Sequence, residues 1–182
     1  AVSDIDLDGV QEVITGNAVY GPDGEVKWYD PDQFDGMIGV ANLDDDPEGE
    51  FVASSFDTVR AVDTNGQVLW GPLPLENANI VSPSCIGDLD GDGRVEIVVA
   101  GGNRLVTLHA DGTVMWTAPI TDLSGASGAS LFDFEGDGSP EVVYIDEIEM
   151  IAFDGLTGEQ KFWTDKHSSD TMMDYPVIAD VD

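Results

Sequence analysis

Five acidic loops of one pattern recur along this chain and constrain its fold more than any other feature. The third, residues 88–96, has the sequence DLDGDGRVE, with oxygen-bearing side chains at positions 1, 3, 5 and 9 and a glycine at position 6. That glycine lets the backbone turn back through positive φ, so the carboxylates converge on one point. They would repel one another strongly without a cation. Ca²⁺ is the hard cation that best tolerates such an irregular set of oxygen ligands.

The other copies keep this spacing. The oxygen-bearing residues are Asp4, Asp6, Asp8 and Glu12; Asn42, Asp44, Asp46 and Glu50; Asp88, Asp90, Asp92 and Glu96; Asp133, Glu135, Asp137 and Glu141; and, at the start of a fifth copy, Asp180 and Asp182. The first positions fall at residues 4, 42, 88, 133 and 180, so the steps are 38, 46, 45 and 47 residues. A period of about 40 to 50 residues is typical of propellers and solenoids.

Each loop leads into a short β-branched run, such as IVVA at 97–100, which predicts a strand. In the second repeat four such runs, at 38–41, 51–54, 59–62 and 67–70, alternate with turns that include the hairpin signal Asn65-Gly66. No segment shows helical periodicity of useful length. We therefore predict an all-β fold, a β-propeller of four-stranded antiparallel blades.

The repeat also predicts where the blades lie. We expect four blades at about 1–30, 37–72, 82–118 and 127–164, and a fifth that starts at 175–182 with Tyr175–Ala179 as its inner strand. Because four blades do not easily close a ring, we expect a larger propeller that continues at both ends of this segment.

Strand alternation predicts which loops share a face. The acidic loops and the D-G, N-G or T-G hairpin turns should lie on one face, and the long blade-to-blade connections at 29–37, 71–84, 117–129 and 164–176 on the other. These connections vary in length and sequence, as recognition loops on a fixed scaffold do.

Four tryptophans hold one place in the repeat, on the last strand of each blade: Trp28, Trp70, Trp116 and Trp163. We expect them to pack against the neighbouring sheet. The single cysteine, Cys85, has Pro83 and Ile86 close to it in the sequence and is expected to be a buried structural thiol.

The charge balance restricts the partners. The chain has 37 acidic and 6 basic residues and a net charge of −31, which disfavours nucleic acid and anionic membrane surfaces. No apolar run is long enough to span a membrane. Loops that need millimolar Ca²⁺ point to an extracellular or cell-surface location, or to the periplasm.

These residues resemble the FG-GAP/VCBS repeat family, which includes the calcium-binding blades of integrin α-subunits. The first and third loops match its motif D-x-D-x-D-G-x-x-[DE] fully. The resemblance implies secreted or cell-surface propellers of about seven blades with three to four Ca²⁺ sites here, one per blade. It also implies that position 7 ligates through its backbone carbonyl, which belongs here to Val10, Glu48, Arg94 and Ser139.

Two loops depart from the family pattern. In the second, Asn42 replaces the first aspartate and Pro47 occupies the glycine position. Because proline cannot adopt positive φ, this loop should bend differently. Of the four expected Ca²⁺ sites, it is the doubtful one. In the fourth, Glu135 is one methylene longer than aspartate and Pro140 precedes Glu141, so altered metal geometry is expected.

Rival motif assignments fit less well. An EF-hand needs flanking helices and a glutamate at position 12 of its loop, where this chain has Thr15, Val99 or Tyr144. Residues 61–70 and 152–158 also resemble the tryptophan-docking repeats of quinoprotein dehydrogenases, but no constellation for a quinone cofactor is visible.

Two functions remain open. The first is a calcium-binding adhesion, binding or structural module that docks a protein or glycan through its variable loops, without catalytic residues. The second is a secreted polysaccharide lyase or hydrolase, for which Asp122, Asp165, Asp170 or Asp174 could supply an acid. The small number of basic residues disfavours a grip on a uronate chain. Outside the acidic loops, the connection that holds His167 is the stretch most like a functional loop.

Overall fold

The computed structural model describes residues 1–122, 124–170 and 173–179, and in these ranges it contains strands and turns but no helix. Asp180 and Asp182, which the repeat assigns to a fifth loop, lie outside the described residues. No helix in the described part is long and apolar enough to cross a membrane.

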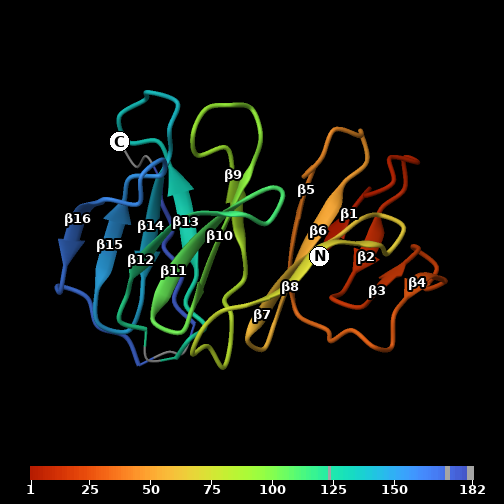
Figure 1. Cartoon of the computed structure of the whole chain (residues 1–182), viewed down its shortest axis with the longest axis horizontal. Helices are drawn as coiled ribbons and strands as arrows, with labels where there is room; N and C mark the ends of the chain where they lie inside the picture. Colours follow the sequence, from red (N-terminus) through yellow and green to blue (C-terminus); the bar gives the residue numbers. More distant parts are fainter. Residues whose placement is uncertain (123, 171–172, 180–182) are drawn as a thin grey trace.

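Sixteen strands form four antiparallel sheets of four, each in chain order. The first holds β1 (Val2–Ser3), β2 (Glu12–Ile14), β3 (Ala18–Tyr20) and β4 (Val26–Tyr29), and the second holds β5 (Met37–Ala41), β6 (Glu50–Ser55), β7 (Thr58–Val62) and β8 (Val68–Pro74). The third holds β9 (Cys85–Gly87), β10 (Glu96–Gly101), β11 (Arg104–His109) and β12 (Val114–Pro119), and the fourth holds β13 (Ala129–Phe132), β14 (Glu141–Ile145), β15 (Met150–Phe153) and β16 (Gln160–Thr164). The sheets follow one another along the molecule from the N-terminal to the C-terminal side (Figure 1). The predicted all-β fold of four-stranded antiparallel blades is therefore confirmed.

The hydrophobic core lies between the sheets, in three seams. Ile14, Val19 and Phe51 belong to the seam between the first two sheets. The second seam packs Val52 and Ala61 against Val99. The third packs Val98 and Trp116 against Tyr144, among others. The central strands of the second and third sheets thus contribute side chains to two seams each, because successive residues point to opposite faces of the sheet.

The tryptophans link each blade to the next, as predicted. Trp70 donates its indole N–H to the Ala110 carbonyl at 2.7 Å and lies against Gly112, so that a Cβ at that glycine would sit 2.7 Å from the ring. Trp116 repeats this arrangement with the Gly155 carbonyl and Gly158. Glycine is needed in these hairpin turns both for its positive φ and for the close approach of the indole ring.

Trp28 and Trp163 mark the two ends of this series. Trp28 lies against Gly66 of the second blade. Trp163 has no following turn to cover it in the described chain, and its indole N–H donates to the carboxylate of Glu149 within its own sheet. The repeated aromatic position is therefore a blade-to-blade contact in three places.

Two expectations about the connections need correction. Strands β8 and β12 continue to Pro74 and Pro119, into segments that we expected to be loops. Both are outer strands with a free edge, where proline removes no ladder hydrogen bond.

The segment expected as a fifth inner strand is not a strand in the structure. Residues 173–179 run beside the start of β13, where the Asp174 carbonyl accepts a hydrogen bond from the Gly128 N–H at 2.9 Å. The Pro176 carbonyl accepts one from the Ser130 hydroxyl at 2.7 Å. Pro176 has no N–H to donate, so it contributes only its carbonyl to this contact. Cys85, expected to be buried, is only partly buried: it packs against the core of the third seam, and this burial raises the pKa of its thiol to about 11.

A candidate metal centre in each acidic loop

Each acidic loop connects the first and second strands of its sheet and is closed by its final glutamate. These glutamates, Glu12, Glu50, Glu96 and Glu141, are the first residues of β2, β6, β10 and β14 and are almost completely buried. In each, Oε2 accepts a hydrogen bond from the backbone N–H at position 2 of the loop, at distances from 2.5 to 3.1 Å. The other carboxylate oxygen, Oε1, is left to interact with the loop interior.

The residue at position 2 anchors the loop. Ile5, Leu43 and Leu89 occupy this position and are buried, whereas Phe134 in the fourth loop is exposed. This role was not predicted from the sequence, although an apolar residue stands at position 2 of all four loops. Burial of that side chain fixes the position of its backbone N–H, which donates the hydrogen bond to the loop glutamate.

Hydrogen bonds inside the loops preset the carboxylates at positions 1, 3 and 5. In the third loop Asp88 Oδ2 accepts from the Gly93 N–H at 2.9 Å, and Asp92 Oδ1 accepts from the Arg94 N–H at 2.7 Å. Gly93 has φ +89°, and the equivalent Gly9 and Gly138 have φ +90° and +91°. The predicted positive φ at position 6 is thus confirmed in three loops.

The carboxylate oxygens converge in each loop. Ligand atoms lie within 4.8 Å of one another in four sets that each belong to a single loop: Asp4, Asp6 and Asp8; Asp44, Asp46 and Glu50; Asp88, Asp90 and Asp92; and Asp133, Glu135 and Glu141. Asp137 accepts a hydrogen bond from the Ser139 N–H at 3.0 Å and is not in the fourth set.

Lysine side chains enter the first and fourth loops. Lys27 on β4 places Nζ 2.8 Å from Asp6 Oδ2 and 2.8 Å from Glu12 Oε1. Lys161 on β16 places Nζ 2.9 Å from Glu135 and 2.6 Å from Glu141. Their ammonium groups neutralise part of the carboxylate charge, and sequence analysis did not identify them.

The pKa shifts in these two loops reflect the lysines. The hydrogen bond from Lys27 lowers the pKa of Asp6 despite partial desolvation. Burial raises the pKa of Glu141, but the hydrogen bonds from Lys161 and the Phe134 N–H outweigh it, so the net shift is downward. The same contacts raise the pKa of both lysines.

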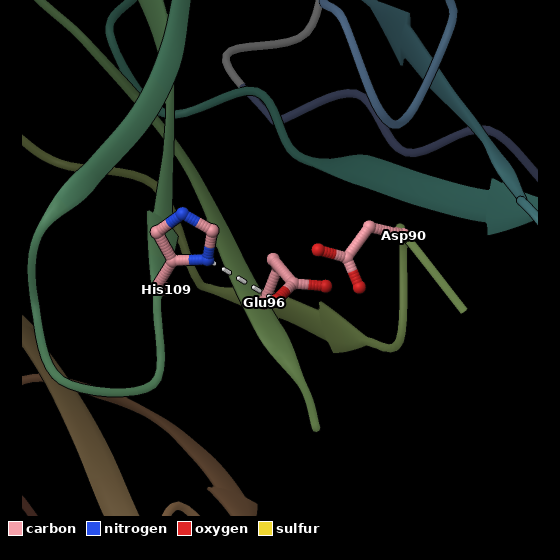
Figure 2. A group of neighbouring side chains, drawn as sticks. All are labelled: Asp90, Glu96 and His109. Carbon is pink, nitrogen blue, oxygen red and sulfur yellow. Dashed lines mark ion pairs between the residues drawn. The ribbon is translucent and has the colours of Figure 1, made fainter. Parts of the chain in front are cut away.

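The third loop has no lysine and instead faces His109 on β11. Figure 2 shows Asp90, Glu96 and His109 pointing toward one another, with His109 Nδ1 3.5 Å from Glu96 Oε1. Burial raises the pKa of Glu96, the Asp90 carboxylate adds to that rise, and the Leu89 N–H and His109 oppose it. The side chain of Arg94 points away from this cluster and pairs with Asp45 of the second loop at 2.6 Å.

The second loop bends differently, as its sequence predicted. Pro47 does not adopt positive φ, and the Asn42 side-chain amide donates to the carbonyls of Asp46 and Glu48 at 2.6 and 3.3 Å. The Glu48 carbonyl, an expected metal ligand, is thus already engaged. Burial raises the pKa of Glu50, and the carboxylates of Asp44 and Asp46 raise it further.

These groups suit a hard cation. The donors in each loop are carboxylate oxygens, and Asp4 Oδ1 is buried without a hydrogen-bond partner. Calcium takes six to eight oxygen ligands, whereas zinc sites favour nitrogen and sulfur. His109 at the third loop is the one nitrogen donor among these clusters, and it lies at the edge of a carboxylate set.

The opposite face of the sheets carries a small polar groove, which we name the amide groove. Asn77, Asn79, Asn103, Asp122 and Ser124 line it, together with Ile80, Gly102 and Gly125, around a cavity of about 220 Å³. These residues come from the connection that follows β8, the β10–β11 turn and the connection that follows β12. Sequence analysis identified the connections but not the groove.

The comparisons with known proteins agree with this architecture. Residues 88–144, which include the whole of the third and fourth acidic loops, match the model of the FG-GAP-like repeat. No curated protein sequence matches the chain significantly.

Solved structures share the fold at low sequence identity. The Vibrio cholerae biofilm matrix protein Bap1 is similar over 100% of this chain and 57% of its own, with a TM-score of 0.82 and 17% identity. The rhamnogalacturonan lyase YesW is similar over 89% of this chain and 41% of its own (TM-score 0.63, 16% identity), and BamB from Moraxella catarrhalis over 90% and 49% (TM-score 0.56, 18% identity). The chain therefore spans between 41% and 57% of the length of these proteins, carries an FG-GAP-like repeat at residues 88–144, and has the fold of a β-propeller segment.

Proposed function

We propose that this chain is the calcium-binding part of an extracellular β-propeller that serves as an adhesion, binding or structural module. Ca²⁺ would occupy the acidic loops, and the third loop carries this proposal most directly. It combines converging carboxylates with a buried Glu96 whose charge no lysine neutralises. A buried carboxylate is costly without a partner, and a divalent cation supplies one.

The blade pattern belongs to the same proposal. Blades at about residues 1–30, 37–72, 82–118 and 127–164 each bring one loop to the same end of their sheet. The ligands would be the carboxylates of each loop with the carbonyls of Val10, Arg94 and Ser139, and Asp180 and Asp182 would start a further site. The first and fourth sites would also require Lys27 or Lys161 to move aside.

The amide groove is the proposed recognition site on the opposite face. Three asparagine side chains at a shallow polar cavity can donate and accept hydrogen bonds with sugar hydroxyls. The similarity to a biofilm matrix protein supports an extracellular glycan or protein as the partner.

Calcium titration tests the metal sites. Calorimetry on metal-stripped protein should show three to four sites, and adding Ca²⁺ should raise the melting temperature. A site filled at one hundred times its Kd stabilises the fold by about 2.7 kcal/mol. No heat of binding and an unchanged melting curve would refute the proposal.

A binding assay tests the groove. Asn79→Ala should weaken retention of the protein on an immobilised matrix polysaccharide, while Asn65→Ala, in a hairpin turn on the calcium face, should not. Equal retention of both variants would exclude the groove as the recognition site.

The alternative is a polysaccharide lyase or hydrolase, which the shared fold of YesW permits without supporting its chemistry. Of the six basic residues, Arg60 is buried and Lys27, Lys161 and Arg94 are engaged with loop carboxylates. Few cations therefore remain to bind a uronate chain. Formation of unsaturated sugar products from a pectic substrate would favour the enzyme.

A further inference from the structure

The third seam contains four oxygen-bearing side chains that the loop sites do not use. We name Asp122, Ser127, Tyr144 and Asp146 the seam cluster. All four are buried, and each has a buried oxygen without a hydrogen-bond partner: Asp122 Oδ2, Ser127 Oγ, Tyr144 Oη and Asp146 Oδ2. Buried polar atoms are nearly always satisfied, so four together call for an explanation.

The topology brings these side chains to one place. Tyr144 and Asp146 are two residues apart at the end of β14, so they point to the same face of their sheet. That face packs on the third sheet, since Tyr144 belongs to the same core cluster as Trp116 and Ile120. Asp122 and Ser127 lie in the connection between these two sheets.

The pKa shifts are consistent with this proximity. Burial raises the pKa of Tyr144, the Asp122 carboxylate raises it further through its charge and through interaction with the Tyr144 hydroxyl, and the Asp146 carboxylate adds to the rise. Interaction with the Ser127 hydroxyl opposes it. Burial also raises the pKa of Asp146, with smaller contributions from the carboxylates of Glu149 and Asp122.

The second oxygen of each carboxylate is already used. Asp122 Oδ1 accepts hydrogen bonds from the Ser124 N–H at 2.9 Å and the Gly125 N–H at 2.8 Å. Asp146 Oδ1 accepts from the N–H groups of Ile148 and Glu149, both at 2.9 Å. The turns thus fix both carboxylates and leave each Oδ2 directed inward.

The other repeats show that these residues are not demanded by the blade itself. Three residues after the loop glutamate, the second and third blades have Ala53 and Val99 where the fourth has Tyr144. Five residues after it they have Ser55 and Gly101 where the fourth has Asp146. The first blade has Thr15 and Asn17 at these two positions, so among the four blades the combination of a tyrosine with an aspartate is found in the fourth.

The first seam offers a comparison within the molecule. There Arg60 is buried and donates to the Gly16 and Phe34 carbonyls at 2.5 and 2.8 Å. A side chain of the protein supplies the buried positive charge in that seam. In the third seam the charges are negative, and no lysine, arginine or histidine in the described chain forms an ion pair with Asp122 or Asp146.

We propose that the seam cluster binds a divalent cation of the calcium type, at a site distinct from the loop sites and on the opposite side of the sheets. Two carboxylates match its charge, and the two hydroxyls add neutral oxygen ligands, which suits a hard cation. Since Asp122 also lines the amide groove, the cation would fix one wall of that groove.

Ca²⁺ stoichiometry from equilibrium dialysis tests this site. Asp122→Asn and Asp146→Asn keep the Oδ1 atoms that hold the turns but remove the charges. Each should bind one Ca²⁺ fewer than the wild type. The matched control is Asp57→Asn, which removes an exposed carboxylate from the equivalent β6–β7 turn and should leave the stoichiometry unchanged. Unchanged stoichiometry in both cluster variants would overturn the proposal.

Two further measurements keep the proposal independent of the loop sites and of variant folding. If the loops bind Ca²⁺, Asp90→Ala should remove a different ion, and the double variant of Asp90→Ala with Asp146→Asn should bind two fewer than the wild type. If the loops bind no metal, Asp146→Asn alone should abolish Ca²⁺ binding. Wild-type crystals soaked in Tb³⁺ should show an anomalous peak between Asp122 and Asp146. Water there, without an anomalous peak, would refute the site.

Discussion

The first and fourth acidic loops share one backbone plan with the third, but they differ in what neutralises their carboxylates. Lys27 and Lys161 place ammonium groups against Glu12 and Glu141. In the third loop the equivalent Glu96 faces His109 and the carboxylate of Asp90. The pKa of Glu141 is lowered and that of Glu96 is raised as a result. A similar motif can therefore hold a lysine ammonium among its carboxylates, as in the first and fourth loops, or lack one, as in the third.

The largest expected effect separates these two kinds of loop by metal-linked stability. Asp90→Ala should abolish the stabilisation that Ca²⁺ gives the third loop, about 2.7 kcal/mol at one hundred times Kd. Asp6→Ala should remove less, because Ca²⁺ must displace Lys27 from the first loop before it binds. Thermal melts with and without excess Ca²⁺ measure both losses. Equal losses would show that Lys27 does not reduce the stabilisation that Ca²⁺ gives to its loop.

Removing the lysines should reverse their effect. Lys27→Met and Lys161→Met leave the loop glutamates without a cation, so both variants should melt below the wild type in metal-free buffer. Their loops should bind Ca²⁺ at least about tenfold more tightly, because a like charge within 4 Å has gone. Calorimetric titration gives the affinities. Lys166→Met is the control, since in the described chain Lys166 forms its ion pair with the exposed Asp165 and none with a loop carboxylate, and it should change neither quantity.

These lysines show where sequence reasoning stopped. The loops, the strands after them and the tryptophan contacts follow from local spacing, and were predicted. Lys27 and Lys161 reach their glutamates from the fourth strand of the sheet, so their role depends on how the sheet twists and pairs. The seam cluster depends on the packing of two sheets, and the extension of β8 to Pro74 depends on its having a free edge. Such features arise from contacts between segments distant in sequence.

The pH dependence of stability should differ in sign between the loops when metal is absent. For Glu96, whose pKa is raised in the native state, the folded protein binds more protons than the unfolded chain above about pH 4.5, so this residue's contribution falls as pH rises through that window. For Glu141, whose pKa is lowered, the contribution is present above the unfolded value and is lost as pH falls through the folded one.

Urea denaturation in metal-stripped buffer would measure the free energy of unfolding at several pH values. A range of about pH 3 to 7 brackets the ordinary pKa of glutamate. Glu96→Gln should make the free energy of unfolding decline less with rising pH than in the wild type. Glu141→Gln should make the free energy of unfolding decline less on acidification than in the wild type. Matching pH profiles for the two variants would remove the distinction between the loops.

The smallest expected effect concerns position 4 of the loops, where the first differs from the third in backbone strain. Leu7 has φ +56° and is exposed, whereas Gly91 and Gly136 occupy this position with φ +76° and +69°. The left-handed region costs a residue with a Cβ about 1–2 kcal/mol, and glycine loses about 0.5–1 kcal/mol through its greater freedom when unfolded. Leu7→Gly should therefore stabilise the metal-free protein by about 0.5 kcal/mol on balance.

Val10→Gly is the matched control for this change. Val10 is also exposed and in the first loop, but it does not have positive φ, so the same loss of a side chain should destabilise by about 0.5–1 kcal/mol. Urea denaturation of both variants measures the difference in sign. If Leu7→Gly destabilises as much as Val10→Gly, the left-handed residue is not strained. The difference between the first and third loops would then rest on the charged groups that face them, Lys27 in the first and His109 in the third.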